Sequence, residues 1–470
     1  MSENDSNQAY KRSLSPVERL FIRHPFAIVT MVARIRGNVT ETMVSDAISK
    51  VQQRHPHLRS RIVDDGQGNP WLTSEGSGAI PVQTVQRESA DHWIGLVQES
   101  CQVPFDFDQR PPVRFILIQS SIASDLVILC HHVICDGLSL AYLARDLLIH
   151  LGYPDREVER LPAPVPIGLD NLPQGISLNP VARFFINRIN KKWQGDKIAF
   201  DDQDYRDLNE AYWAKFEHQI LSVELSEAQT SALVDRCREN GVTVNSALTT
   251  AFVGAQCIVQ GNRSYHASIG VAADVRKRLR KPVGEVMGFY AGLVTPKFKY
   301  DVRTGFWENA SNFQNQFKPL VTNKKLFGGF LSWCALDPSV LEAINFKKLG
   351  GLVAPHQASY RKLSAFSRQD DVVLGLLKRD KQESLERIYM GTAVTNLGRL
   401  DLARTYGALE LDRLIMQPGG AFPLANVNLV LGAVTCSGKL SLVIEYAEQA
   451  VDTETAVKIK DKAMAFLLDL

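Results

Sequence analysis

Apolar and polar positions in the first part of the chain alternate with periods that predict strands and helices in turn. The run FAIVTMVARIRG (residues 26–37) reads as a strand, and residues 41–58 then show helical spacing that Pro56 ends. Residues 58–74 predict a hairpin around the turn-forming DDGQGN, and residues 90–102 predict a second helix. This order favours a mixed α/β domain with antiparallel hairpins over a regular alternation of parallel strands and helices.

The next apolar runs end in a short polar stretch. Two long strands joined by a polar turn are predicted within PVRFILIQSSIASDLVILCHHV (residues 112–133). The second strand ends at two adjacent histidines, His131 and His132, and an Asp-Gly pair then precedes an amphipathic helix that begins near Leu138. The histidines therefore lie where a strand passes into a helix.

The second half of the chain shows the same mixture of strand and helix patterns, after a segment of different composition. Residues 150–215 are rich in proline, turn-forming residues and charge, which indicates a domain boundary. Beyond it strands and helices resume, with Thr243 and Asn245 as candidate N-cap residues and Ser437-Gly438 at the turn of a hairpin. We expect an α/β (α+β) protein with a disordered leader at 1–13, an N-terminal domain at 14–175, a linker at 176–215 and a C-terminal domain at 216–470.

Composition and charge exclude several classes of protein. The 470 residues carry a net charge of +2, which argues against a nucleic-acid-binding protein. The seven cysteines contain no C-x-x-C pair, so neither a disulfide framework nor a zinc site is predicted. No segment has the apolar core of a signal peptide or the length of a membrane span. We expect a soluble cytoplasmic protein with reduced thiols and no metal, nucleic acid or membrane span.

The histidine pair suits acid–base chemistry better than metal binding. Successive side chains on a strand point to opposite faces, so His131 and His132 do not converge on one metal ion. A single imidazole that faces a cleft fits a general base, because its pKa lies near neutral pH. The residues alone leave a second interpretation open, in which the histidine is a hydrogen-bonded core group and Asp136 only caps the next helix.

The spacing from His131 to Gly137 is H-H-x-x-x-D-G, at a strand end and before a helix. In this context the motif resembles that of the condensation-domain and acyl-CoA-dependent acyltransferase superfamily. Other segments agree in type and order: LSPVERLF, QQRHPHLRSRIV, VPFDFDQRPPVRFILI, NGVTVNSALTTAF, VAADVRKRLRKPVGEVMGFYAG and VTNLGRLDL. The sequence looks most like free-standing alcohol O-acetyltransferases and mycobacterial polyketide-associated acyltransferases. The D-F-G-W-G motif of the plant-type branch is not present as such.

The resemblance implies a fold and a mechanism. It implies two chloramphenicol-acetyltransferase-like subdomains, each a mixed sheet with flanking helices, that form a V-shaped pair around a tunnel. Donor and acceptor would enter from opposite mouths. His132 would be the general base that removes a proton from the acceptor as it attacks the thioester carbonyl, without a covalent acyl-enzyme. The resemblance implies no bound cofactor, a donor that is acyl-coenzyme A or a phosphopantetheinyl acyl carrier protein, and a monomer.

Residues around His132 receive supporting roles from the same resemblance. Asp136 is expected to pair with Arg276 and so to fix the loop that orients the base. His131 is expected to be structural, and Gly137 to leave room for the donor arm.

Other residues are candidates for ligand contacts. Tyr290 and Asn396 are expected to line the acceptor side and to stabilise an oxyanion, although a turn explains Asn396-Leu397-Gly398 equally well. The basic run RKRLRK (residues 276–281) is a candidate contact for coenzyme A phosphates or an acidic carrier protein, and a solvated surface is the alternative. Cys135 is expected to pack at the strand end and not to act as a nucleophile.

These residues predict an acyltransferase that moves an acyl group from a thioester to an alcohol in lipid, polyketide or other secondary metabolism. Two alternatives stay open. One keeps the fold and the base but forms an amide, as a free-standing condensation enzyme of nonribosomal peptide assembly. The other is a catalytically silent module that binds carrier proteins, against which the intact motif argues.

Overall fold

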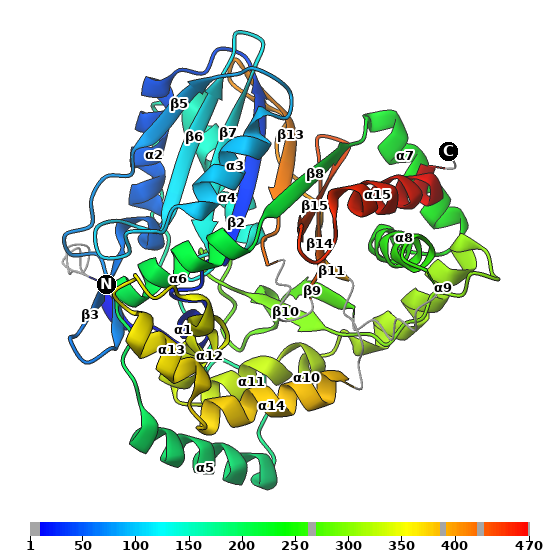
Figure 1. Cartoon of the computed structure of the whole chain (residues 1–470). Coiled ribbons are helices and arrows are strands. Elements are labelled where there is room, and N and C mark those ends of the chain that lie inside the picture. Colours follow the sequence, from blue (N-terminus) through cyan, green and yellow to red (C-terminus); the bar gives the residue numbers. More distant parts are fainter. Residues whose placement is uncertain (1–9, 262–268, 386–391, 421–426, 469–470) are drawn as a thin grey trace.

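The computed structural model describes residues 10–261, 269–385, 392–420 and 427–468. These residues form a mixed α/β structure with two six-stranded sheets, and the predicted fold class is confirmed (Figure 1). The first sheet has the order β12 (Thr405–Tyr406), β13 (Leu409–Gln417), β2 (Ile28–Arg36), β7 (Ala123–His131), β6 (Val113–Gln119), β5 (Val82–Gln86). The second has the order β10 (Ala291–Val294), β9 (Gly270–Asp274), β11 (Thr392–Arg399), β14 (Leu429–Cys436), β15 (Lys439–Ala447), β8 (His218–Glu224).

Helices pack beside both sheets and fill the region below them in Figure 1. In chain order they are α1 (Pro16–Phe21), α2 (Glu41–Arg54), α3 (His92–Gln102), α4 (Gly137–Gly152), α5 (Pro180–Asp196), α6 (Asp202–Lys215), α7 (Glu227–Glu239), α8 (Val244–Val259), α9 (Phe306–Phe317), α10 (Asn323–Leu326), α11 (Gly328–Ala335), α12 (Pro338–Leu349), α13 (Tyr360–Arg368), α14 (Val372–Leu385) and α15 (Thr453–Leu468). Of the described helices, none alone has the length and apolar character to cross a membrane; α7 and α8 reach both only as a pair, with a 96° bend between them.

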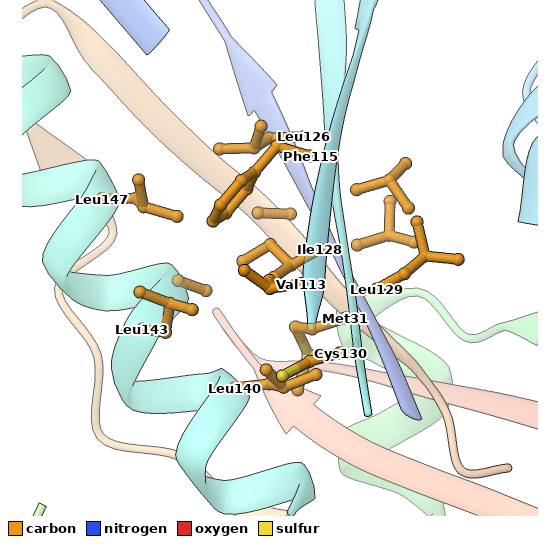
Figure 2. Close-up of a cluster of buried hydrophobic side chains, with 14 of the residues drawn as sticks. Met31, Val113, Phe115, Leu126, Ile128, Leu129, Cys130, Leu140, Leu143 and Leu147 are labelled. Atoms are coloured by element: carbon orange, nitrogen blue, oxygen red, sulfur yellow. The ribbon is translucent and has the colours of Figure 1, made fainter. Parts of the chain in front are cut away.

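The motif strand packs within the first hydrophobic core. Leu140, Leu143 and Leu147 of α4 recur with the helical period and lie against Val113 and Ile128 of the sheet (Figure 2). All five are at most 2% exposed. Full burial of a leucine contributes about 1.5–3 kcal/mol, so this stripe fixes α4 against the sheet and with it the start of the helix.

Local signals set several element ends as the sequence predicts. Helix α2 ends at Arg54, directly before the His55-Pro56 pair, because the residue before a proline disfavours the helical conformation. Thr243 caps α8 by accepting a hydrogen bond from Ser246 N at 3.1 Å, whereas Asn245 lies inside the first turn.

The predicted leader needs one correction. Lys11–Ser13 forms strand β1, which pairs with β4 (Pro70–Thr73), and β4 pairs in turn with β3 (Arg61–Asp64) as the predicted hairpin. Residues 11–13 are therefore ordered by sheet pairing, which the polar composition did not indicate. Residues 1–9 lie outside the described part of the chain.

The segment predicted as a linker, residues 176–215, contains two helices. Helix α6 buries Tyr205, Leu208 and Tyr212, each at most 2% exposed, and so belongs to the packed body of the protein. Its charged residues do not all face solvent, since Arg206 and Glu210 are exposed whereas Asp204 and Asp207 are buried and accept hydrogen bonds from Lys362 and Ser359.

The second half of the chain contributes two strands to the first sheet. Strands β12 and β13 lie beyond residue 400, yet β13 pairs with β2 in the first sheet and also lies against β14 and β15 of the second. The predicted boundaries thus do not describe this part of the chain, since a segment of 216–470 completes the N-terminal sheet. The tunnel implied by the resemblance stays a prediction.

Candidate active site

The histidine motif occupies the turn between β7 and α4. His131 N donates to Pro112 O at 3.0 Å, and His132 N donates to Ala27 O at 2.8 Å, so the backbone is held on both sides as it leaves the sheet. Ile134 N then donates to His131 O at 3.1 Å, which closes a tight turn. The side chain of Asp136 caps α4 by accepting from a backbone N–H.

His132 has the hydrogen bonding of a neutral base. Its Nδ1 lies 3.1 Å from the carbonyl oxygen of Cys135. A carbonyl only accepts, so Nδ1 carries the proton and the lone pair of the neutral ring resides on Nε2. The half-buried ring packs between Phe21 and Phe289, with centroid distances of 5.3 Å and 5.4 Å.

The surroundings of His132 favour its neutral form. Burial lowers the pKa of the imidazole below its ordinary value, because the charged ring loses hydration. The Cys135 carbonyl, the charge of Asp136, the Pro418 carbonyl and the charge of Glu445 act in the opposite direction and limit the decrease of the pKa. The ring is therefore unprotonated at neutral pH and able to accept a proton.

His131 has a different environment. Its side chain is fully buried, its Nε2 lies 3.3 Å from the His24 carbonyl oxygen, and its Nδ1 accepts from Val133 N at 3.2 Å. The edges of Phe105 and Phe107 surround the ring, and burial lowers its pKa to about 3. This histidine is a hydrogen-bonded core group, in agreement with the structural role expected for it.

Asp136 and Arg276 form the ion pair expected from the sequence. Arg276 Nη2 lies 2.7 Å from Asp136 Oδ1, and both side chains are at most 5% exposed. Ser139 N donates to the same Oδ1 at 2.8 Å, and Tyr290 N donates to Oδ2 at 2.9 Å. Burial acts to raise the pKa of Asp136, but the charge of Arg276 and these hydrogen bonds outweigh it and lower the pKa. Asp136 thus has both roles considered from sequence, helix cap and ion-pair partner.

Two residues missed by the sequence reasoning complete this cluster. Ser139 Oγ lies 2.9 Å from Asp136 Oδ1 and accepts from Arg276 Nη2 at 2.8 Å. Asp274 Oδ1 accepts from Arg276 Nη1 at 3.0 Å. Ser139 lies two residues after Gly137, and Asp274 lies two residues before Arg276. Their only signal in the sequence is that they are close to residues already predicted to belong to the site.

Tyr290 contacts this cluster, whereas Asn396 forms a local turn. Tyr290 OH donates to Val165 O at 2.9 Å, and the ring lies 4.8 Å from the Arg276 guanidinium. Asn396 Oδ1 accepts from Gly398 N at 2.8 Å, which is the turn considered as its alternative role. Contacts of Tyr290 and Asn396 with an acceptor stay predictions.

Gly137 lies in close contact with side chains of the second half of the chain. A Cβ atom at this position would lie 2.7 Å from Met416 Sδ and 3.3 Å from a methyl group of Leu397. Both neighbours come from the second half of the chain, so the glycine lets that half approach the start of α4. Space for a donor arm at Gly137 stays a prediction.

The basic run divides into one buried and several exposed charges. Arg276 is engaged with Asp136, whereas Lys277, Arg278, Arg280 and Lys281 are exposed. Contact of these exposed charges with phosphate or a carrier protein stays a prediction.

Two hollows each include a residue that interacts with His132. One, of about 250 Å³, is lined by Phe289 and Tyr290 together with Glu18 and His57. The other, of about 360 Å³, is lined by Gln417 and Glu445 among other residues. Phe289 contacts the His132 ring, so the first hollow shares a wall residue with the surroundings of the base, whereas Glu445 of the second hollow acts on the pKa of His132 through its charge.

Neither metal nor thiol chemistry is indicated by the described residues. In the ranges that the structure covers, no group of three or more His, Cys, Asp or Glu side chains could hold a metal ion. All seven cysteines are free, and Cys135 is buried with its pKa raised well above the ordinary value by desolvation. A thiol in this state is a poor nucleophile, as expected from its place at the strand end.

Residues 17–154, which contain the whole motif, match the family model of the Condensation domain. A linear gramicidin synthase of Brevibacillus parabrevis is 30% identical over 120 residues, 24% of this chain and 2% of that protein. Phosphinothricin tripeptide synthetase PhsC of Streptomyces viridochromogenes is 24% identical over 304 residues, 60% of this chain and 26% of that protein. The matches thus span about a quarter or less of these relatives.

Solved structures extend the similarity to the whole chain. Polyketide synthase associated protein 5 from Mycobacterium tuberculosis has a TM-score of 0.58 at 15% identity, covering 97% of this chain and 98% of that one. TRI3 trichothecene 15-O-acetyltransferase from Fusarium sporotrichioides has a TM-score of 0.60 at 14% identity, covering 100% of this chain and 96% of that one. At these identities the structures show a shared fold. Together the comparisons confirm the resemblance to the condensation-domain and acyltransferase superfamily.

Proposed function

We propose that this protein transfers an acyl group from a thioester to an alcohol, with His132 as the general base. The hydrogen bond from His132 Nδ1 to Cys135 O carries this proposal. It commits one ring nitrogen to the backbone and leaves the lone pair of Nε2 for a substrate proton. The coarser activity, transfer of acyl or peptidyl groups, is supported by the Condensation domain match.

The reaction proceeds in one transfer without an acyl-enzyme. Nε2 of His132 accepts the hydroxyl proton while the alcohol oxygen attacks the thioester carbonyl carbon. The carbon–sulfur bond then breaks, and the imidazolium returns the proton to the leaving thiolate, which leaves an ester, a free thiol and the neutral base. General base assistance contributes about 10²–10⁴-fold to such a step, and alignment of the two substrates contributes further.

Asp136 and Arg276 hold this base in position and do not take part in proton transfer. Their ion pair fixes the start of α4, and Cys135, whose carbonyl orients the imidazole, immediately precedes Asp136. Because the Asp136 carboxylate is satisfied by Arg276, Ser139 N and Tyr290 N, it is not a free proton acceptor. Its role is to hold the geometry in which Nε2 meets the acceptor.

The donor is proposed to be acyl-coenzyme A or a carrier-protein thioester. Exposed Lys277, Arg278, Arg280 and Lys281 follow directly after the buried Arg276 and supply positive charge that suits phosphate groups or an acidic carrier. The name of the trichothecene 15-O-acetyltransferase, which shares the fold, supports an alcohol as acceptor.

Amide formation is the second candidate. The curated proteins that match this chain include nonribosomal peptide synthetases, in which the matched region is a small part of a much longer protein. The same base would remove a proton from an attacking amine, so the chemistry at His132 does not distinguish the two products.

Thiol release measured with donors and acceptors in a matrix separates these candidates. The purified protein is supplied with acetyl-, medium-chain and long-chain acyl-coenzyme A, or acyl-loaded carrier protein, together with alcohols alone or amines alone. Ester formation predicts thiol release that depends on an alcohol. Release that depends on an amine would replace the proposal by amide synthesis, and a folded protein inactive with every donor would contradict both.

A further inference from the structure

Helix α5 lies at the outer surface of the protein, below the helical region in Figure 1. It packs against α11 and α14, and its inner face is fixed by specific contacts. Trp193 is fully buried and donates from Nε1 to Ser339 Oγ at 2.8 Å, while Asn190 Nδ2 donates to Ala335 O at 3.0 Å. These contacts set the rotation of the helix, so the opposite face is held toward solvent.

The outward face begins with large apolar side chains. Val181 is 65% exposed, Phe184 is 63% exposed and Phe185 is 46% exposed. Positions i, i+3 and i+4 share one side of a helix, so the three side chains form one patch. The two phenylalanine rings contact each other edge to face at 5.8 Å. Exposed aromatic pairs are costly in water, and a contiguous patch of this kind marks an interaction surface.

Positive charge follows this patch along the helix, because Arg188 and Lys192 continue its side, whereas Arg183 lies toward the side of Asn190. Arg183, Arg188, Lys191 and Lys192 are all exposed, and Asp196 is the acidic residue of the helix. In the part of the chain that the structure describes, no carboxylate forms an ion pair with any of these four cations. The outward face therefore changes from apolar to cationic along the helix.

We propose that α5 attaches the protein to an anionic lipid surface. Its N-terminal end would insert the side chains of Val181, Phe184 and Phe185 at the level of the headgroups and upper acyl chains. The cations that follow would contact lipid phosphates. The patch lies on a helix at the outer surface, and the neighbouring cations form no ion pairs among the described residues. This arrangement suits a broad anionic surface better than a protein groove. This inference is independent of the proposed reaction.

Vesicle flotation tests the proposal with the full chain. The native protein is mixed with vesicles of phosphatidylcholine alone or of phosphatidylcholine with phosphatidylserine. We expect binding to the phosphatidylserine vesicles that weakens as salt rises, because the electrostatic part is screened. Removal of two charges in Lys191→Gln/Lys192→Gln is expected to weaken partition by roughly tenfold or more, since each cation near the surface contributes about 1 kcal/mol.

Two variants that replace exposed apolar residues by serine distinguish binding through this patch from nonspecific hydrophobic binding. Phe184→Ser/Phe185→Ser is expected to abolish flotation, whereas Ile122→Ser, at a position 80% exposed in the β6–β7 turn, is expected to leave it unchanged. Both variants are checked for native circular dichroism. Flotation that is equal in the phenylalanine variant and the native protein would overturn the proposal. The proposal would also be overturned if the native protein bound neither kind of vesicle. It would be overturned as well if the native protein were a dimer and the phenylalanine variant, but not the Ile122 variant, were a monomer.

Discussion

Arg276 and Asp136 are 140 residues apart in sequence, and their side chains form a buried ion pair with 2.7 Å between Nη2 and Oδ1. One partner caps the helix that follows the histidines, and the other belongs to the second half of the chain, directly after β9. The geometry around His132 therefore depends on both halves. Removal of the Arg276 charge leaves Asp136 without a counter-charge in a buried site, whereas removal of the Asp136 charge leaves Arg276 with Asp274 alone.

Asp136→Asn is expected to lower the free energy of unfolding by about 1–3 kcal/mol, because Arg276 then loses its buried counter-charge and keeps only the more exposed Asp274. Asparagine caps helices about as well as aspartate, so the loss reports the ion pair more than the cap. Urea unfolding of the native protein and the variant measures this difference. Arg303→Gln, at a surface pair with Asp301 in which the Arg303 side chain is 84% exposed, is the control with little expected effect. An Asp136→Asn variant as stable as this control would contradict the role assigned to the pair.

Much of the first half could be predicted from the sequence, because its signals are local. The strand that ends at His131 and the helix that follows show clear hydrophobic periods, and the Asp-Gly pair marks their junction. The expected pairing of Asp136 with Arg276 came from the family resemblance, since no local pattern links residues so far apart.

Long-range pairing explains what the sequence did not reveal. Strand β13 pairs with β2 in the first sheet, with Leu414 opposite Ala33. Hydrophobic alternation predicts that a segment is a strand but does not say which strand it will pair with. Strand β1 is short and polar, and it is held by pairing with β4 and by the ion pair of Arg12 with Glu18, neither of which its composition indicates. Phe21 and Phe289 were not selected because single phenylalanines usually belong to a core, and their contact with His132 requires the folded chain.

Gly137→Ala is expected to destabilise the protein by about 1–3 kcal/mol, because the new methyl group would lie 2.7 Å from Met416 Sδ. Displacement of Met416 would also shift the start of α4, so activity should fall with stability. The matched change is Gly95→Ala in the exposed part of α3, where a Cβ atom meets nothing within 4 Å. This control is expected to gain about 0.5–1 kcal/mol from helix propensity. Equal effects of the two substitutions on thermal unfolding would exclude the packing explanation.

Acid is expected to destabilise the fold through its buried histidines. Burial lowers the pKa of His57 to about 4 and that of His131 to about 3, whereas both titrate near 6.5 in the unfolded chain. Below pH 6.5 the unfolded state thus binds protons that the folded state does not, and stability falls as the pH falls toward 4. Each histidine contributes a slope of about 1.4 kcal/mol per pH unit within this window. His57→Gln should reduce the slope of urea stability against pH, and an unchanged slope would argue against a neutral buried His57.

The charge of Glu445 is expected to influence the pH dependence of activity. It raises the pKa of His132 against the effect of burial, so Glu445→Gln should lower that pKa further. Activity that requires neutral His132 would then persist to lower pH in the variant. The measurement is the midpoint of the acidic limb of kcat/KM against pH, with Glu239→Gln at the exposed end of α7 as the control. A midpoint that moves to higher pH would contradict the electrostatic account.

The most direct test of the central claim compares the native protein with His132→Ala in thiol release from a donor and alcohol that the native protein uses. We expect the variant to lose about 10²-fold or more in kcat, with circular dichroism unchanged, because the proton acceptor is absent. A variant that folds and keeps the native rate would contradict the assignment of His132 as the general base.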